Sequence, residues 1–259
     1  MRQNGADNKN TQALLLPGER VEDLQNGFFI IQSPACFAFG TDAVLLAHFV
    51  RARAGERVVD FGTGDGIIPI LLCAHVPGLC VTGLEVQPEL ADLAKRSVAL
   101  NGLEERVSLV YGDIREARKL LGTGFDVVVT NPPYINRGGG IVNPLDTKAI
   151  SRHELFCSLE DVIRTSSKLL VPCGRFAMVH KPERLADIIY LMRTWKIEPK
   201  YLRFVHPSPY KKPNLLLIRG IKNGNPELKM MEPLYVYDEN GNYSDEINRI
   251  YGREVKKDE

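Results

Sequence analysis

Residues 58–66, with the sequence VVDFGTGDG, decide the fold, because they join an apolar strand pattern to a glycine-rich turn and then to a helical pattern. In open α/β sheets, ligands bind at the carboxyl ends of the strands, near the point where the strand order reverses. Glycine at such a strand end allows positive φ and a close approach of the backbone to a ligand. We therefore expect a ligand site after the strand Arg57–Phe61, with Gly62, Gly64 and Gly66 in its turn.

Strand and helix patterns alternate along the chain on both sides of this turn. The predicted strands are Asn26–Ser33, Arg57–Phe61, Leu79–Glu85, Val107–Tyr111, Phe125–Thr130, Arg175–His180, Tyr201–His206 and Leu215–Lys222. The predicted helices are Asp42–Arg51, Gly66–Val76, Pro88–Asn101, Ile114–Leu121, Leu159–Leu170 and Pro182–Trp195. Short strands that alternate with helices indicate βαβ units, so the sequence predicts an α/β fold with a mostly parallel sheet and helices on both faces. The last two strands have only a short connection and are expected to form an antiparallel edge.

The composition is typical of one globular domain, since 44% of the 259 residues are hydrophobic and 25% are charged. Residues 1–20 are expected to be a flexible leader, and residues 21–259 a single domain. No apolar run approaches the roughly 20 residues that span a bilayer, and the polar start does not resemble a secretory signal. We therefore expect a cytoplasmic protein without a membrane partner, and a monomer is favoured. The five cysteines include no Cys-x-x-Cys pair, which argues against a metal.

An acidic residue, Glu85, ends the second strand of the alternating series, about 20 residues after the glycines. A carboxylate at this place can accept hydrogen bonds from both ribose hydroxyls of a bound nucleoside. Nicotinamide dehydrogenases share this arrangement, so the glycines and the acid together indicate only a nucleoside-type ligand.

Two details favour S-adenosylmethionine over a dinucleotide. The glycine spacing is Gly-x-Gly-x-Gly, which does not indicate a compact phosphate-cradling turn. Asp60 precedes the glycines, and its carboxylate would repel a pyrophosphate but suits a ligand that has an ammonium and a sulfonium. Asp113, followed by Ile114, comes after the third strand and can accept from the adenine amine of the cofactor. Alternatively, Asp113 only caps the following helix.

The decisive motif for the chemistry is Asn131-Pro132-Pro133-Tyr134, directly after the fourth strand. An exocyclic adenine amine is a poor nucleophile, because its lone pair is delocalised into the ring. The side-chain oxygen of Asn131 and the carbonyl of Pro132 can accept both amine hydrogens, and proline stiffens the backbone that presents them. Tyr134 offers a flat face for an extruded base. The alternative is that the motif is only a rigid turn.

With these motifs, the chain resembles the Rossmann-like class I methyltransferases. Three further stretches are similar to the bacterial tRNA(Val) adenosine-37 N6-methyltransferase family: residues 37–47 (FAFGTDAVLLA), 151–154 (SRHE) and 212–214 (KPN). The resemblance implies a seven-stranded sheet, S-adenosylmethionine as cofactor, and methylation of the adenosine beside the anticodon. It also implies that Thr41 and Asp42 lie over the methionine end of the cofactor, although Asp42 can equally be a helix cap.

A tRNA partner must then be bound by the domain's own surface. The net charge is only +1, but the segment 199–226 contains six Lys or Arg residues and no Asp or Glu. From this segment we select Arg203, Lys211 and Lys212, and from the preceding loop Arg137 and Arg152, as candidate RNA-binding residues. The alternative for the basic segment is a solvated strand hairpin.

Proteins of other classes remain as rivals to this interpretation. Methyltransferases that modify a glutamine of a release factor also use Asn-Pro-Pro-Tyr, but they have a substantial helical N-terminal domain. DNA adenine methyltransferases normally contain a target-recognition insert. A non-catalytic RNA-binding protein that holds S-adenosylmethionine is the alternative that involves no enzyme.

Overall fold

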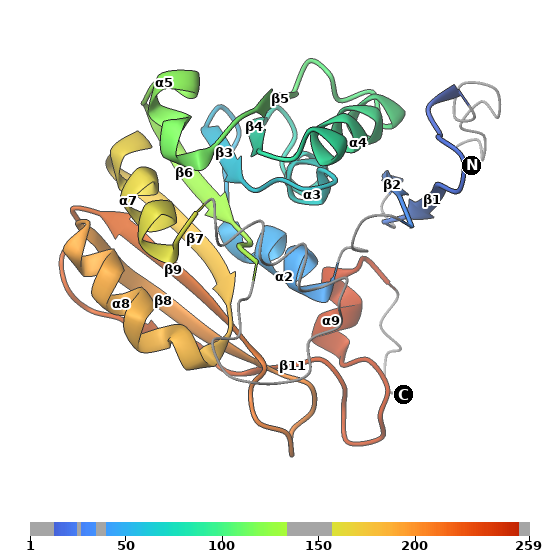
Figure 1. The fold of residues 1–259 in the computed structure, drawn as a ribbon. Coiled ribbons are helices and arrows are strands. Elements are labelled where there is room, and N and C mark those ends of the chain that lie inside the picture. The colour runs from blue at the N-terminus through green and yellow to red at the C-terminus, as the bar shows by residue number, and fades with distance from the viewer. Residues whose placement is uncertain (1–12, 25–26, 35–39, 134–156, 254–259) are drawn as a thin grey trace.

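A computed structural model describes residues 13–24, 27–34, 40–133 and 157–253. Its strands are β1 (Arg20–Asp23), β2 (Phe29–Gln32), β3 (Arg57–Phe61), β4 (Cys80–Glu85), β5 (Val107–Tyr111), β6 (Phe125–Thr130), β7 (Leu170–His180), β8 (Ile197–His206), β9 (Leu215–Lys222), β10 (Lys229–Met230) and β11 (Leu234–Tyr235). Its helices are α2 (Thr41–Val50), α3 (Ile67–His75), α4 (Pro88–Leu100), α5 (Ala117–Leu121), α7 (Leu159–Leu169), α8 (Leu185–Thr194) and α9 (Asp245–Ile250), with short 3₁₀ turns η1 (Ile114–Glu116) and η2 (Pro182–Arg184). Figure 1 shows their arrangement.

The main sheet has the order β10-β8-β9-β7-β6-β3-β4-β5, with β11 also paired to β8. Strands β3 to β7 pair in parallel, and the chain leaves β3 toward β4 and β5 before it returns to β6 on the other side of β3. The strand order therefore reverses between β3 and β6. The predicted parallel sheet is confirmed, and its reversal point lies where the glycine turn and the Asn-Pro-Pro motif begin.

The antiparallel edge is also confirmed. Strand β9 lies between β7 and β8 and runs antiparallel to both of them. The seven strands from β3 to β9 correspond to the expected seven-stranded sheet, and the two-residue strands β10 and β11 extend it beside β8. Because β8 runs in the same direction as β7, the turn after β8 lies at the carboxyl edge of the parallel strands.

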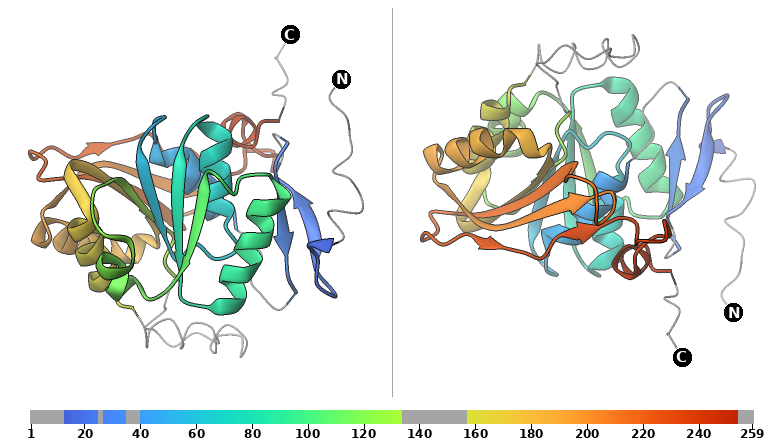
Figure 2. Two further views of the ribbon diagram at one scale, coloured as in Figure 1. Left: turned by 90° about the horizontal axis from the view of Figure 1, so that it is seen from above. Right: turned by 90° about the horizontal axis from the view of Figure 1, so that it is seen from below.

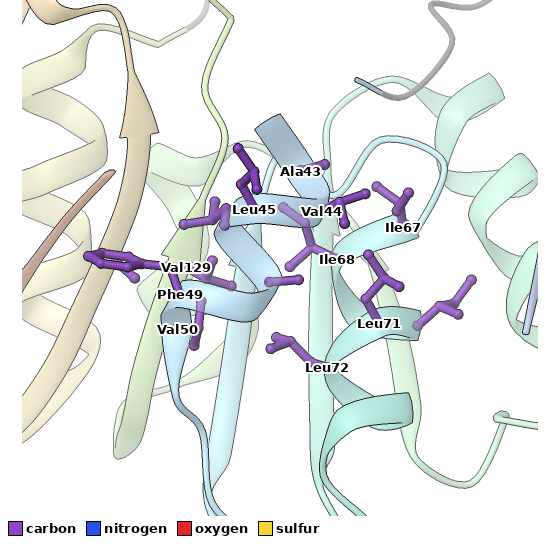
Figure 3. Packing of buried hydrophobic residues seen from close by; sticks show 14 of the residues in the cluster. Ala43, Val44, Leu45, Phe49, Val50, Ile67, Ile68, Leu71, Leu72 and Val129 are labelled. Carbon is purple, nitrogen blue, oxygen red and sulfur yellow. The ribbon is translucent and has the colours of Figure 1, made fainter. Parts of the chain in front are cut away.

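Helices cover both faces of the sheet (Figures 1 and 2). Val58 of β3 belongs to the buried cluster that includes α2, α3 and α4, whereas the next residue, Val59, belongs to the cluster with α7 and α8. Side chains of a strand point alternately to its two faces, so the continuous apolar run of β3 fills both cores. Figure 3 shows α2 packed beside α3 in the first of them.

The N-terminal part of the described chain is more ordered than a flexible leader would be. Glu19 accepts a hydrogen bond from Arg96 of α4 at 2.9 Å, and its side chain is only 5% exposed. The next residues form β1, which pairs with β2 in an antiparallel hairpin that the sequence analysis did not predict. Asn101 at the end of α4 holds this hairpin through the backbone of Phe29, with N–O distances of 2.8 and 2.7 Å.

The helix α9 was not predicted either. The hydroxyl of Ser244 caps it by accepting from the amide of Ile247, and its apolar residues pack against α2 and β11. No helix among the described residues is long and apolar enough to cross a membrane. Within the same residues, no group of three or more His, Cys, Asp or Glu side chains could hold a metal ion.

Candidate active site

A cavity of about 760 Å³ lies at the carboxyl edge of the sheet, over the point where the strand order reverses. One part of its wall comes from the turns after β3, β4 and β5: Gly62, Gly64, Glu85, Gln87, Asp113 and Ile114. Another part comes from the ends of β6 and β7 and from α8: Asn131, Pro132, Pro133, His180, Arg184 and Leu191. Residues 157–160 and Val162 form a third part of the wall. The cavity thus joins the predicted cofactor residues to the predicted catalytic residues.

The glycine turn after β3 has the conformation that its sequence requires. Gly62, Gly64 and Gly66 have φ values of 71°, 59° and 90°, a region that residues with a Cβ rarely adopt. Gly62 and Gly64 line the cavity. Gly66 instead faces α4, where a Cβ would come within 3.3 Å of the Cβ of Ala94. Gly66 therefore allows the close packing of α3 and α4, and it is not among the residues of the cavity wall, so its contact with a ligand stays a prediction.

The carboxylate of Glu85 is buried and held in one orientation by backbone amides. Its Oε2 accepts from the amide of Gly64 at 2.9 Å, and its Oε1 accepts from the amides of Val86 and Gln87, both at 2.9 Å. A carboxylate offers about four acceptor positions. Glu85 therefore links the glycine turn to β4 and still has acceptor capacity toward the cavity that it lines.

Asp60 differs from the expectation for a residue in contact with the ligand. Its side chain is completely buried, and the Thr63 hydroxyl is close enough to lower its pKa, although the two groups do not meet in good hydrogen-bond geometry. Burial raises the pKa of Asp60 to about 7, and the negative charges of Glu85 and Asp65 add to this effect. Asp60 is not part of the cavity wall, so a direct contact with the ammonium or sulfonium of a ligand has no support from this arrangement.

Asp113 lines the cavity and also caps the following 3₁₀ turn. It accepts from the amide of Arg115 at 2.8 Å and from the Arg115 guanidinium at 2.6 Å. Burial opposes ionisation of this carboxyl, but the hydrogen bonds and the charge of Arg115 outweigh it and lower its pKa. Asp113 therefore does cap the 3₁₀ turn, and its contact with adenine stays a prediction in which it would share a carboxylate that already binds Arg115. Ile114 adds an apolar surface to the same wall.

Asn131, Pro132 and Pro133 follow β6 directly and line the cavity. The preceding Thr130 is buried, and its hydroxyl donates to the carbonyl of Phe61 at 3.0 Å, which fixes the end of β6 against β3. The backbone that presents Asn131 and Pro132 is therefore anchored beside the glycine turn. Tyr134 lies outside the described residues.

His180 is a wall residue that the sequence analysis missed. It ends β7, is only 4% exposed, and its Nδ1 accepts from the amide of Lys181 at 2.7 Å. Burial and the positive charge of Arg184 lower the pKa of His180 to about 4, so the ring is neutral at pH 7 with its proton on Nε2. The signal was present in the sequence, since the predicted strand Arg175–His180 ends in a polar residue at the ligand-binding edge.

Comparison with known proteins assigns the fold and the cavity to one family. The family model described as "Methyltransferase small domain" matches residues 31–187, which is more than half of the chain. The chain belongs to this family. The matched residues include the end of β2 and all of β3 to β7, and thus the glycine turn, Glu85, Asn131 and His180.

Individual relatives of this methyltransferase agree with the family. It is 30% identical over 232 residues to the tRNA1(Val) (adenine(37)-N6)-methyltransferase of Porphyromonas gingivalis, which covers 86% of this chain and 90% of the relative. The protein of the same name from Aeromonas salmonicida is 28% identical over 163 residues, or 62% of this chain and 66% of the relative. Among solved structures, a predicted O-methyltransferase from Agrobacterium tumefaciens has the same fold, with a TM-score of 0.67, 24% identity, and coverage of 82% of this chain and 95% of that one.

Two other predicted cofactor residues of the methyltransferase, Thr41 and Asp42, lie in the first turn of α2. Asp42 accepts from the amide of Ala43 in its own helix at 2.9 Å, and the Thr41 side chain is hydrogen-bonded to Tyr251 near the end of α9. Neither residue belongs to the described cavity wall. Their contact with a cofactor therefore stays a prediction.

The basic segment 199–226 contains one arginine that is bound to other residues and two lysines that are exposed. Both terminal nitrogens of Arg203 bind the carboxylate of Glu246 in α9, at 2.6 and 2.7 Å, and its Nε donates to the carbonyl of Glu232 at 2.8 Å. Arg203 therefore docks the C-terminal helix, and an RNA phosphate would have to compete with Glu246 for it. Lys211 and Lys212 are exposed in the turn between β8 and β9, at the carboxyl edge of the sheet. Arg137 and Arg152 lie outside the described residues.

Proposed function

We propose that this methyltransferase transfers a methyl group from S-adenosylmethionine to the N6 amine of an adenosine in tRNA, at the position beside the anticodon. The observation that supports this most is the shared cavity in which Asn131 and Pro132 face the same space as Gly64 and Glu85. The relatives named above as tRNA adenine N6-methyltransferases support the choice of substrate.

The cavity residues fit the cofactor. The buried carboxylate of Glu85 is already oriented by three amides, so its one remaining acceptor position suits a ribose hydroxyl. Ile114 and Leu90 provide apolar surface for an adenine ring, and Gly62 and Gly64 leave the space that a side chain would fill. S-adenosylmethionine supplies an activated methyl group when it is bound there.

The target amine needs acceptors and no covalent nucleophile. The Asn131 side-chain oxygen and the Pro132 carbonyl accept the two hydrogens of the amine, which becomes more tetrahedral as its nitrogen attacks. Because Thr130 anchors this backbone to β3, little reorganisation is needed during the reaction. The proton that the nitrogen loses departs to water, since the imidazole of His180 is a poor base with a pKa of about 4. Tyr134 stacks on the extruded base.

The tRNA is bound outside the cavity by exposed basic residues. Lys211 and Lys212 contact phosphates from the turn after β8, and Arg137 and Arg152 do so from the segment that follows the catalytic motif in the sequence. We further propose a monomeric, cytoplasmic enzyme with one domain from residue 21 to residue 259.

Isotopic methyl transfer tests this function. The purified chain is incubated with labelled S-adenosylmethionine and separately with bulk tRNA, DNA and a protein extract. Label in N6-methyladenosine from tRNA, mapped next to the anticodon, is the expected result. Label in a methylated glutamine of a protein, or no label in any substrate, would exclude the proposal. The first of these results would point to the release-factor type of enzyme, and the second to the non-catalytic binding protein.

A further inference from the structure

Arg219, in the middle of β9, is a half-buried cation that has no polar partner among the described residues. Its guanidinium lies between two aromatic rings, 4.7 Å from the centroid of Phe49 and 4.6 Å from that of Tyr201. Its Nε is buried and has no hydrogen-bond partner, and no ion pair of Arg219 exists within the described part of the chain. Figure 3 shows the Phe49 ring projecting from α2 in the direction away from α3.

Such an arrangement is unusual because buried polar groups are nearly always hydrogen-bonded. A guanidinium has five N–H donors in a fixed plane and no acceptor. The two rings fix the plane of Arg219 but accept none of these hydrogens in the ordinary way. The side chain is therefore oriented in advance, with donor capacity that the described residues leave unused.

Two further arginines surround this group. Burial and the positive charges of Arg51 and Arg175 lower the pKa of Arg219. Arg51, at the end of α2, is exposed. Arg175 of β7 is bound to Glu56. This one carboxylate offsets only part of the charge of three guanidiniums, which leaves an excess of positive charge around Arg219.

The carbonyl end of α2 explains the place of Arg175 but not that of Arg219. Arg175 donates to the carbonyl of Arg51 at 3.3 Å, as expected for a cation beside the negative end of a helix. Arg219 makes no such hydrogen bond within the described residues. Its buried Nε therefore has no partner within the described residues, and its other donors are left for water or for a ligand.

We propose that Arg219, together with Arg51 and Arg175, forms a phosphate-binding site that holds a phosphodiester of the RNA substrate outside the catalytic cavity. The planar fork of arginine matches two phosphate oxygens better than a lysine does. This proposal rests on the proposed function for its source of phosphate, since a free phosphate has the same chemistry.

The site lies on the face of the sheet that α2 covers, whereas core residues of the other face, among them Val162 of α7, line the cavity. Arg219 pairs with Ala177 of β7, three residues before His180 in the cavity wall. At roughly 3.3 Å per residue, Ala177 and His180 are about 10 Å apart along β7. The phosphate that binds Arg219 therefore belongs to another part of the tRNA than the base in the cavity, because the sheet lies between the two places.

The test uses the full chain with Arg219→Gln, and with Arg57→Gln as a matched control. Arg57 also stacks on an aromatic ring, 4.7 Å from the centroid of Phe125, but its Nη1 donates to the carbonyls of Thr123 and Gly124, both at 3.2 Å. We expect Arg219→Gln to weaken tRNA binding. The slope of the logarithm of the binding constant against the logarithm of the salt concentration (the salt slope) should become less steep by about 0.7–0.9, with S-adenosylhomocysteine affinity unchanged. Arg57→Gln should leave the slope as in the wild type.

Inorganic phosphate provides a second readout that does not depend on the RNA substrate. Its binding is followed by ³¹P NMR at constant ionic strength, and we expect Arg219→Gln to abolish it and Arg57→Gln to preserve it. Arg51→Gln alters an exposed side chain and should weaken the binding of both tRNA and inorganic phosphate. It takes the place of Arg219→Gln in the test if that variant does not fold. Unchanged phosphate binding in the Arg219 and Arg51 variants would overturn the site. Abolished phosphate binding with an unchanged tRNA slope would overturn RNA as its ligand.

The two readouts also separate this proposal from the proposed function. If the wild-type chain methylates no tRNA, the proposed function fails, while phosphate binding by the wild type and its absence in Arg219→Gln still establish the site. If tRNA is methylated and the Arg219 variant keeps the wild-type slope and phosphate affinity, only the phosphate site fails.

Discussion

The carboxylate of Glu85 accepts a hydrogen bond from the amide of Gly64, with 2.9 Å between Oε2 and the nitrogen. The acid at the end of β4 therefore holds the glycine turn after β3, and the two motifs form one structural unit. The amides of Val86 and Gln87 bind the other oxygen of the same carboxylate. Any change at Glu85 must then affect both its own ligand contact and the shape of the turn.

Replacing Glu85 by glutamine should weaken S-adenosylhomocysteine binding by about 10- to 100-fold. The amide NH₂ group must face either Gly64 or the pair of amides after β4, and hydrogen bonds to a charged acceptor contribute roughly 1.5–3 kcal/mol. Calorimetric titration measures the change. Glu89→Gln, an exposed residue at the start of α4, should bind as the wild type does. Affinity of Glu85→Gln within twofold of the wild type would contradict the assignment.

The sequence was most informative where local pattern and position agree. Strands β3, β5, β6 and β9 have the predicted bounds, because their apolar runs end in glycine, proline or polar residues. The carboxyl ends of β3, β4 and β6 meet at one edge of any such sheet. Gly64, Glu85 and Asn131 could therefore be brought to one site from the sequence alone.

Partners that are distant in the chain could not be predicted in this way. Arg203 and Lys211 look alike in the sequence, but only the folded chain shows that Arg203 meets Glu246, 43 residues away. Gly66 was taken for a ligand contact because nothing in the local sequence reveals that Ala94 approaches it. Asp60 was misjudged for a related reason, since strand-end position does not show which way a side chain points.

Asn131→Ala should reduce turnover by about 10²–10³-fold and leave S-adenosylhomocysteine affinity nearly unchanged. The deleted oxygen acts on the attacking amine, and removing one preorganised group of this kind elsewhere has an effect of that size. Single-turnover methyl transfer to tRNA and calorimetric titration measure the two quantities. Asn131→Asp keeps an acceptor oxygen and should retain more activity than the alanine variant. Near-normal turnover of Asn131→Ala would remove this residue from the catalytic mechanism.

Asp60 should make the fold less stable as the pH rises. Its pKa is about 7 in the folded state against an ordinary 3.8, so the folded state binds more protons between these values. The contribution of Asp60 to the free energy of unfolding is therefore highest below pH 4 and falls until about pH 7, by on the order of 4 kcal/mol. Urea unfolding of Asp60→Asn should show a smaller decrease between pH 5 and pH 8 than the wild type shows.

Asp92→Asn is the matched control for this experiment, because the Asp92 side chain is 61% exposed in α4. It should follow the wild-type dependence on pH. Asp65 has a buried carboxyl whose pKa is also raised to about 7, chiefly by burial, so some decrease will remain in Asp60→Asn. An Asp60→Asn variant with the full wild-type decrease would show that Asp60 ionises normally in the folded protein.

Lys211 and Lys212 should contribute to tRNA binding, since both are exposed in the turn between β8 and β9. Strand β8 runs parallel to β7, so this turn lies at the edge that also presents His180 to the cavity. Lys181, next to His180, reaches the same turn, where its Nζ donates to the carbonyl of Asn214 at 3.4 Å. The turn is thus attached to the cavity wall, and phosphates flanking an adenosine in the cavity would come near its lysines.

The double variant Lys211→Ala, Lys212→Ala should therefore weaken tRNA binding and flatten its dependence on salt. Each phosphate that the protein no longer neutralises reduces the slope by about 0.7–0.9, so two phosphates predict a change of about 1.4–1.8, measured by fluorescence anisotropy across a salt series. Lys200→Ala is the control from the same basic segment, because the Lys200 ammonium is bound to the carbonyls of Asn225 and Pro226 at 3.2 and 3.1 Å. It should keep the wild-type slope, and all three proteins should bind S-adenosylhomocysteine equally. A wild-type slope in the double variant would move tRNA recognition to Arg137, Arg152 and the loop between them.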